Sequence, residues 1–184
     1  MWTSFIPDPL HPAIVHLPIA LMVLLPVTFL VGVVAIRRGG SPLKVWSVAA
    51  AMHVALVLSA WASLATGDEA GERVEAVVAD GPIETHEEAA EAFVAIAAGA
   101  LVISLIGVRK DRIGAVARGT AVAASIGLLL VGWRVGHSGG ELVYRYGAAS
   151  AYATPDSTGT SGGNVARQGG RERRGEDDER GNNP

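Results

Sequence analysis

The chain has 184 residues, of which 49% are hydrophobic and none is cysteine, and its formal net charge is −3. This length favours one domain, and a chain without cysteine cannot by itself form a disulfide, a thiolate metal site or an iron–sulfur cluster. No basic block is large enough to grip nucleic acid, so a nucleic-acid partner is not expected. Nearly all apolar residues lie between residues 13 and 135 in uninterrupted runs, which is typical of membrane proteins.

The first apolar run differs from an export signal. Residues 1–10 contain no Lys or Arg, and the run that follows ends at Arg37 and Arg38 with no small-residue cleavage site. A secretory signal has the reverse arrangement of charge and apolar residues. We therefore expect residues 13–36 to form a first membrane-spanning helix.

Three further segments are apolar over the length needed to cross a bilayer, whose hydrocarbon core of about 30 Å takes roughly 20 helical residues. They cover residues 43–66, 90–108 and 119–136. Four such segments in a chain of this length leave too little polar surface to cover them as soluble core helices. The sequence therefore predicts an all-α integral membrane four-helix bundle within residues 1–152.

Lys and Arg indicate the direction of the four spans. The first connecting loop carries Arg37, Arg38 and Lys44, and the third carries Arg109, Lys110, Arg112 and Arg118. The second loop, residues 67–88, has only Arg73 among eight acidic residues. The positive-inside rule places the first and third loops in the cytoplasm and both termini outside, as expected for a multi-pass protein of the bacterial inner membrane.

Short patterns refine the helices. Pro82 and the acidic residues after it are typical of a first helical turn, so the third span is expected to begin as a polar helix above the membrane. Small residues recur at helix-packing spacing, as Ala95 and Gly99, as Gly119, Ala123 and Gly127, and as Gly132 and Gly136. In a bilayer such rows let helices approach closely, and packing within the bundle explains them.

The C-terminal segment has a different composition. Residues 154–170 are rich in Ser, Thr and Gly, and residues 171–180 mix basic and acidic side chains. This composition lacks the apolar residues that a packed core requires. Residues 153–184 are therefore predicted to be a disordered polar tail.

The five histidines are the main candidates for a functional site. His11 and His16 begin the first span, His86 lies on the polar start of the third, and His137 ends the fourth. Under the predicted topology these four lie in the outer third of the bundle, and bundle cofactor sites are built from such convergent side chains. His53 lies just past the midplane and is a possible supporting residue of such a site. Its alternative role is a hydrogen bond to a Ser or to backbone of a neighbouring helix.

Two cofactor types fit the outer histidines. Two imidazoles on opposite sides could bind haem b axially, and His16, His86 and His137 with a water or with Glu87 could hold a transition-metal ion such as zinc or copper. The alternative for each histidine is a structural one, capping helix carbonyls or lying at the membrane interface.

Proline and glycine shape both ends of this predicted site. Pro18 removes the hydrogen bond to the Ile14 carbonyl, so a kink is expected near His16, with a freed carbonyl that could orient the imidazole. The glycines of residues 136–140 are expected to end the fourth span and turn the chain back. Glu141 and Tyr144 would then fold over the histidines as a lid.

The sequence Leu-His-Pro-Ala-Ile-Val-His-Leu-Pro-Ile-Ala-Leu at residues 10–21 and Gly-His-Ser-Gly-Gly-Glu-Leu-Val-Tyr at residues 136–144 resemble the opening and closing stretches of a bacterial membrane-protein family, domain of unknown function 2231. Thr66-Gly67-Asp68 and His86-Glu87 lie between them, and the resemblance covers about residues 8–150. It implies a four-span fold and no established activity. Members continue after the Tyr with an acid and a His before Gly, whereas Arg145-Tyr146-Gly147 stands here, so one ligand available to relatives is absent.

Two function classes remain open on this sequence. The leading hypothesis is electron transfer by haem b or a transition metal bound to the outer histidines, with other membrane redox proteins as partners. The alternative is a non-catalytic structural or assembly subunit of a larger membrane complex that uses the glycine rows. A transporter is disfavoured because few polar groups continue into the inner half, and no nucleophile–base pair or phosphate loop suggests an enzyme.

Overall fold

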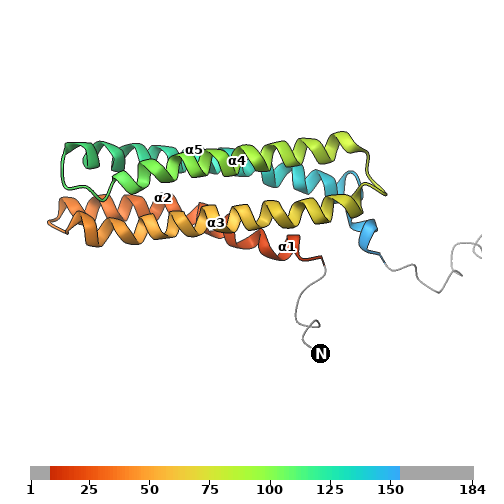
Figure 1. The fold of residues 1–184 in the computed structure, drawn as a ribbon, viewed down its shortest axis with the longest axis horizontal. Coiled ribbons are helices and arrows are strands. Elements are labelled where there is room, and N and C mark those ends of the chain that lie inside the picture. Colours follow the sequence, from red (N-terminus) through yellow and green to blue (C-terminus); the bar gives the residue numbers. More distant parts are fainter. Residues whose placement is uncertain (1–8, 154–184) are drawn as a thin grey trace, which may run out of the picture. The chain divides into compact units, whose positions relative to one another are not determined.

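The computed structural model describes residues 9–153, and within them the chain is helical with no strand. The elements are α1 (His11–Ile14), α2 (His16–Arg37), α3 (Pro42–Val74), α4 (Asp80–Ile106), α5 (Arg112–Tyr144) and the 3₁₀ helix η2 (Ala148–Tyr152). The four long helices lie side by side with alternating direction, and α1 and η2 sit at one end of the bundle (Figure 1). The all-α four-helix fold predicted from the sequence is confirmed. The predicted tail lies outside the described residues, apart from Ala153.

All four long helices are long and apolar enough to cross a membrane: His11–Arg37 (α1 with α2), Pro42–Val74, Asp80–Ile106 and Arg112–Tyr144. The predicted spans 13–36, 43–66 and 119–136 lie inside these helices, and the predicted span 90–108 extends two residues beyond the end of α4. Large apolar side chains cover the outward faces, and Leu130 and Trp133 of α5 are 71% and 69% exposed. Such continuous apolar exposure suits lipid contact, since soluble proteins rarely tolerate it.

The core runs along the bundle axis and mixes a few large side chains with many alanines. Leu25, Phe29, Trp46, Leu56 and Leu128 are almost completely buried. Phe29 of α2 stacks on Trp46 of α3 with ring centres 4.9 Å apart, and the Trp46 indole N–H donates to the Ser104 carbonyl of α4 at 2.8 Å. These contacts join three helices in one layer.

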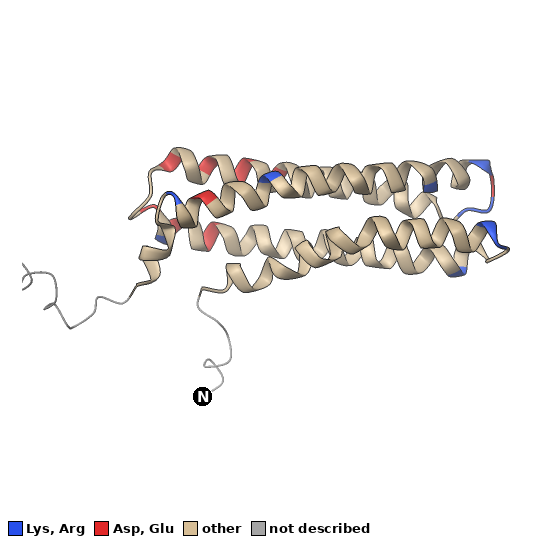
Figure 2. Cartoon of the chain, turned by 180° about the vertical axis from the view of Figure 1, so that it is seen from behind, with Lys and Arg blue, Asp and Glu red and all other residues tan. Residues whose placement is uncertain are grey.

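The two ends of the bundle carry opposite charge (Figure 2). The basic end contains the turns after α2 and after α4, and the acidic end contains α1, the turn between α3 and α4, the end of α5 and η2. Val74, Val78, Ile83 and Ala148 form a small second core at the acidic end. Under the positive-inside rule, the basic end is the one predicted to face the cytoplasm.

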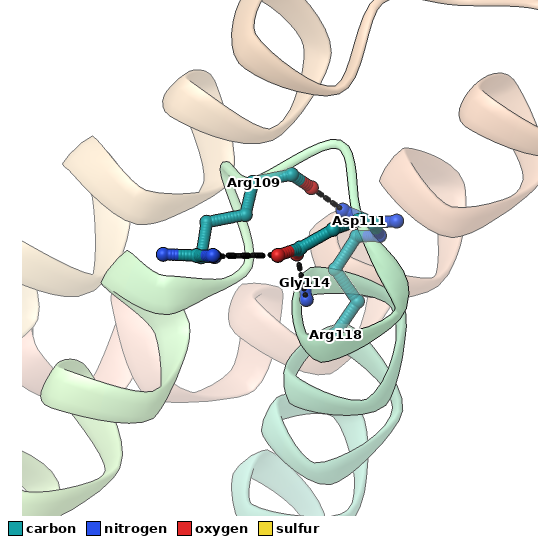
Figure 3. Close-up of polar contacts among 4 residues, drawn as sticks. All are labelled: Arg109, Asp111, Gly114 and Arg118. Atoms are coloured by element: carbon teal, nitrogen blue, oxygen red, sulfur yellow. Dashed lines mark hydrogen bonds and ion pairs between the residues drawn. The ribbon is translucent and has the colours of Figure 1, made fainter.

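Hydrogen bonds to the last turn of α4 order the turn at the basic end (Figure 3). Arg118 of α5 is 7% exposed and donates from Nη1 to the carbonyl oxygens of Gly107 and Arg109, the latter at 2.9 Å. The Asp111 carboxylate accepts from the Gly114 amide at 3.0 Å and from Arg109, and these bonds lower the pKa of Asp111 to about 2. Both ends of the turn are therefore capped by side chains.

The first span is interrupted where the prolines predict it. α1 ends at Ile14 and α2 begins at His16, because Pro18 has no N–H for the Ile14 carbonyl. The break at Val15 lets α1 lean against α3.

Two expectations about glycine are wrong. α5 continues as a helix through residues 136–140 to Tyr144, so the chain does not turn back there; the turn comes at Gly147, whose φ is +74°. Packing within the bundle does not explain the glycine rows either. A side chain at Gly99, Gly119, Gly127 or Gly136 would meet open space, whereas Gly132 packs against Met22 and Phe93.

Candidate metal site at the acidic end

His11 is held between α1 and α3. Its Nδ1 lies 2.9 Å from the Ser63 carbonyl oxygen and 3.3 Å from the Thr66 hydroxyl. A carbonyl oxygen can only accept, so Nδ1 carries the proton and donates it. In the neutral ring, Nε2 is then left with a free lone pair.

His86 is held in the same way between α4 and α5. Its Nδ1 lies 3.0 Å from Oγ of Ser138, while the Ser138 hydroxyl donates its own proton to the Val135 carbonyl at 3.0 Å. The serine oxygen must therefore accept from the histidine, which places the proton on Nδ1 and leaves Nε2 free. Metal-binding histidines commonly donate their second N–H to a carbonyl or another acceptor in this way.

The two imidazoles are neighbours although they are 75 residues apart in the chain. Their ring centres are 6.4 Å apart and the ring planes are nearly perpendicular, at 83°. Both rings are half-buried. The acidic end thus brings together two nitrogen donors of matching tautomer from α1 and α4.

Glycines make room for both rings. A methyl group at Gly67 of α3 would come 3.3 Å from Cε1 of His11, and one at Gly139 of α5 would come 3.0 Å from Cε1 of His86. Both distances are shorter than ordinary carbon–carbon contacts. A side chain at either position would push on an imidazole.

The other two histidines at this end lie on the surface. His16 is exposed, and His137 is exposed and stacks on Trp133 with ring centres 5.3 Å apart. Within residues 9–153 no three His, Asp or Glu side chains are grouped so that they could hold a metal ion. The predicted set of His16, His86 and His137 is therefore not assembled in the described structure, whereas His11 joins His86.

The predicted supporting residues lie apart from the histidine pair. Glu87 faces α3, where a methyl group at Gly71 would lie 3.1 Å from its Oε1. Glu141 forms an ion pair with Arg145 at 3.0 Å, and Tyr144 is 91% exposed. Glu141 and Tyr144 line an open surface hollow with His137 along α5, so they form no lid.

His53 lies away from this end, in the apolar core. It is 1% exposed and its ring meets Phe29 at 5.8 Å between ring centres. Neither of its nitrogens makes a hydrogen bond within the described part of the chain, although the Ala97 carbonyl of α4 lies close enough to interact with the ring. Of the two predicted kinds of partner, a serine and the backbone of a neighbouring helix, no serine bonds to His53 there, and the Ala97 carbonyl is the backbone group beside the ring.

Sequence reasoning missed Ser63 and Ser138, the two residues that orient the histidines. Each lies on the buried face of a helix that is otherwise mostly apolar there. For Ser138 the available signal is its buried hydroxyl, because a hydroxyl within a membrane bundle needs a partner. The sequence does not say which histidine that partner is. Ser63 orients His11 through its backbone carbonyl, while its own hydroxyl donates to the Ser59 carbonyl, so its residue type gives no signal.

Comparison with known families agrees with the helices described above. No curated protein and no solved structure matches the chain significantly. A family model described as predicted membrane protein (DUF2231) matches residues 7–151, which include α1 to α5 in full and η2 except for its last residue. The chain therefore belongs to the DUF2231 family of membrane proteins.

Proposed function

We propose that the acidic end binds one transition-metal ion between His11 and His86, and that the protein uses this ion for electron transfer in the membrane. The observation that carries the proposal is the pair of imidazoles whose Nδ1–H groups are both donated to neighbours. An ion about 2.0–2.1 Å from each of two opposed nitrogens would hold the ring centres roughly 6 Å apart. The observed separation of 6.4 Å is close to that value.

The number of ligands favours copper(I). Structural zinc takes four protein ligands, and no group of three or more His, Asp or Glu side chains in the described residues could share one ion. Copper(I) accepts two nitrogen donors in a line, an arrangement that leaves the angle between the ring planes free. The exchange between copper(I) and copper(II) also supplies the one-electron step that electron transfer needs.

Space favours an ion over haem b. The cavity beside His11, lined by Thr66 and Tyr152 among others, has about 50 Å³, whereas sites for larger cofactors measure roughly 300–1,000 Å³. The hollow at His137 is larger, about 440 Å³, but it is a surface feature of α5 alone. Acidic residues around the end of the bundle would raise the local concentration of cations.

The proposal is tested by competition for copper(I) between the purified protein and a coloured chelator. His11→Ala and His86→Ala should each weaken binding about 10-fold or more, since loss of even a supporting partner of a metal ligand costs that much. His16→Ala and His137→Ala are matched controls from the same end and should bind like the native protein.

Two results would contradict the proposal that His11 and His86 bind the ion. Copper(I) binding that survives in the His11→Ala, His86→Ala double variant would place the ion elsewhere. A low-spin haem spectrum that disappears in His137→Ala would favour haem at the exposed histidines.

A second candidate, a structural subunit of a larger membrane complex, is supported by the outward-facing glycines. Gly99, Gly119, Gly127 and Gly136 have open space beside them, so a helix of another protein could approach the backbone closely at these positions. Bulky substitutions there should release such a partner without changing copper(I) binding. Under either function we place the protein in the bacterial inner membrane with the acidic end outside.

A further inference from the structure

The turn between α2 and α3 carries positive charge that no described residue balances. Arg37 ends α2, Arg38 follows it and Lys44 lies in the first turn of α3, and all three side chains are exposed. The sequence has no Asp or Glu between residues 9 and 67, and none of the three cations forms an ion pair within the described part of the chain. Because like charges repel, a bound anion would stabilise this turn.

The other turn of the basic end supplies an anion of its own. The Asp111 carboxylate accepts hydrogen bonds from Arg109 and from the Gly114 amide, as Figure 3 shows. Lys110 and Arg112 of that turn are exposed. The turn after α4 is therefore partly neutralised from within, and it provides a comparison for the turn after α2.

Exposed apolar side chains lie directly beside the cations of the α2–α3 turn. Val34, four residues before Arg38, is 42% exposed, and Val48, four residues after Lys44, is 65% exposed. Residues four apart lie on the same face of a helix, and α2 and α3 are neighbours in the bundle. The cations thus stand at the polar edge of an apolar surface that both helices share.

We propose that the α2–α3 turn binds the phosphate headgroup of an anionic phospholipid. Arg37, Arg38 and Lys44 pair with the headgroup, and the acyl chains lie along the exposed faces of α2 and α3 that include Val34 and Val48. Basic residues immediately beside a membrane span attract anionic headgroups in this way. A zwitterionic lipid would cover the same apolar faces but would leave the three cations unbalanced.

The test is native mass spectrometry of the purified full-length protein with equal amounts of phosphatidylglycerol and phosphatidylcholine that have identical acyl chains. The native protein should retain more phosphatidylglycerol. The triple variant Arg37→Gln, Arg38→Gln, Lys44→Gln should lose this preference about 10-fold or more, because each cation near an anionic headgroup favours binding roughly fivefold. The three side chains are exposed, so the triple variant should keep the native melting temperature.

Two further variants are matched controls. The double variant Lys110→Gln, Arg112→Gln changes charge at the other turn and should keep most of the preference, and Arg37→Lys, Arg38→Lys keeps the charge and should bind like the native protein. Equal retention of both lipids by the native protein, or equal loss of preference in the triple and double variants, would overturn the proposal. Displacement of phosphatidylglycerol by soluble glycerol phosphate would do so too, since it would indicate a site for free phosphate.

Discussion

Gly139 and Gly136 lie one turn apart on α5 but face different surroundings. A methyl group at Gly139 would come 3.0 Å from His86, whereas one at Gly136 would touch nothing within 4 Å. Gly139→Ala should therefore destabilise the bundle by about 1–3 kcal/mol, the usual cost of overpacking, and should weaken copper(I) binding. Thermal unfolding and metal competition measure the two effects.

Gly136→Ala is the control for that prediction. It should leave copper(I) binding unchanged and stabilise α5 slightly, because alanine favours a helix over glycine by about 1 kcal/mol. Equal loss of metal affinity in both variants would show that the glycines act through helix flexibility and not through the space that they leave for His86.

For single residues, the sequence identified the candidate histidines but did not show which two of them lie together. The opening motif points to His11 and His16 together, yet the break at Val15 turns His11 toward Ser63 and leaves His16 on the surface. The choice depends on the direction of a four-residue helix against α3. Local pattern does not determine that direction, because it is a tertiary contact.

Arg118 joins two elements at the basic end. Its buried guanidinium donates hydrogen bonds to the carbonyls of Gly107 and Arg109, which follow the last residue of α4. Arg118→Met keeps most of the side-chain volume but leaves those carbonyls without a donor, so unfolding free energy should fall by about 1.5–3 kcal/mol. Arg112→Met, at an exposed position of the same turn, should change it little. Equal effects of the two variants would indicate a role of net charge only.

Asp111 gives the same turn a pH dependence. Its folded-state pKa is lowered from 3.8 to about 2 by Arg109 and the Gly114 amide, so its stabilising effect is present above pH 3.8 and is lost as the pH falls toward about 2. Asp111→Asn should melt below the native protein at pH 7, and the difference should shrink through that window. A difference in melting temperature that is constant between pH 5 and pH 2 would contradict this assignment.

The four long helices could be predicted from their long apolar runs, but the residues at which they begin and end could not. The segment predicted for residues 119–136 lies within a helix that continues to Tyr144, since Ser138 and Leu142 still pack against the bundle and offset the cost of Gly139 and Gly140. Pro82 indicated the start of α4 more accurately, because the helix begins only two residues before it, at Asp80.

The orientation of the whole bundle rests on its charge asymmetry. Cysteines at Ser41 and Lys110 of the basic end should be shielded from an impermeant thiol reagent in intact cells, and one at exposed Ala79 should react. Gly114 is unsuitable as a labelling site, because a side chain there would collide with the Arg109 backbone. Labelling at Ser41 and Lys110 but not at Ala79 would show that the bundle has the opposite orientation in the membrane.

Binding of one copper(I) ion between α1 and α4 is tested most directly by X-ray absorption of the copper-loaded protein. The two free Nε2 atoms predict two nitrogen neighbours with the scattering pattern of imidazole, and loss of that pattern in the His11→Ala, His86→Ala double variant. A copper site with sulfur neighbours or with three or more ligands, or a spectrum unchanged in the double variant, would contradict a site built from His11 and His86.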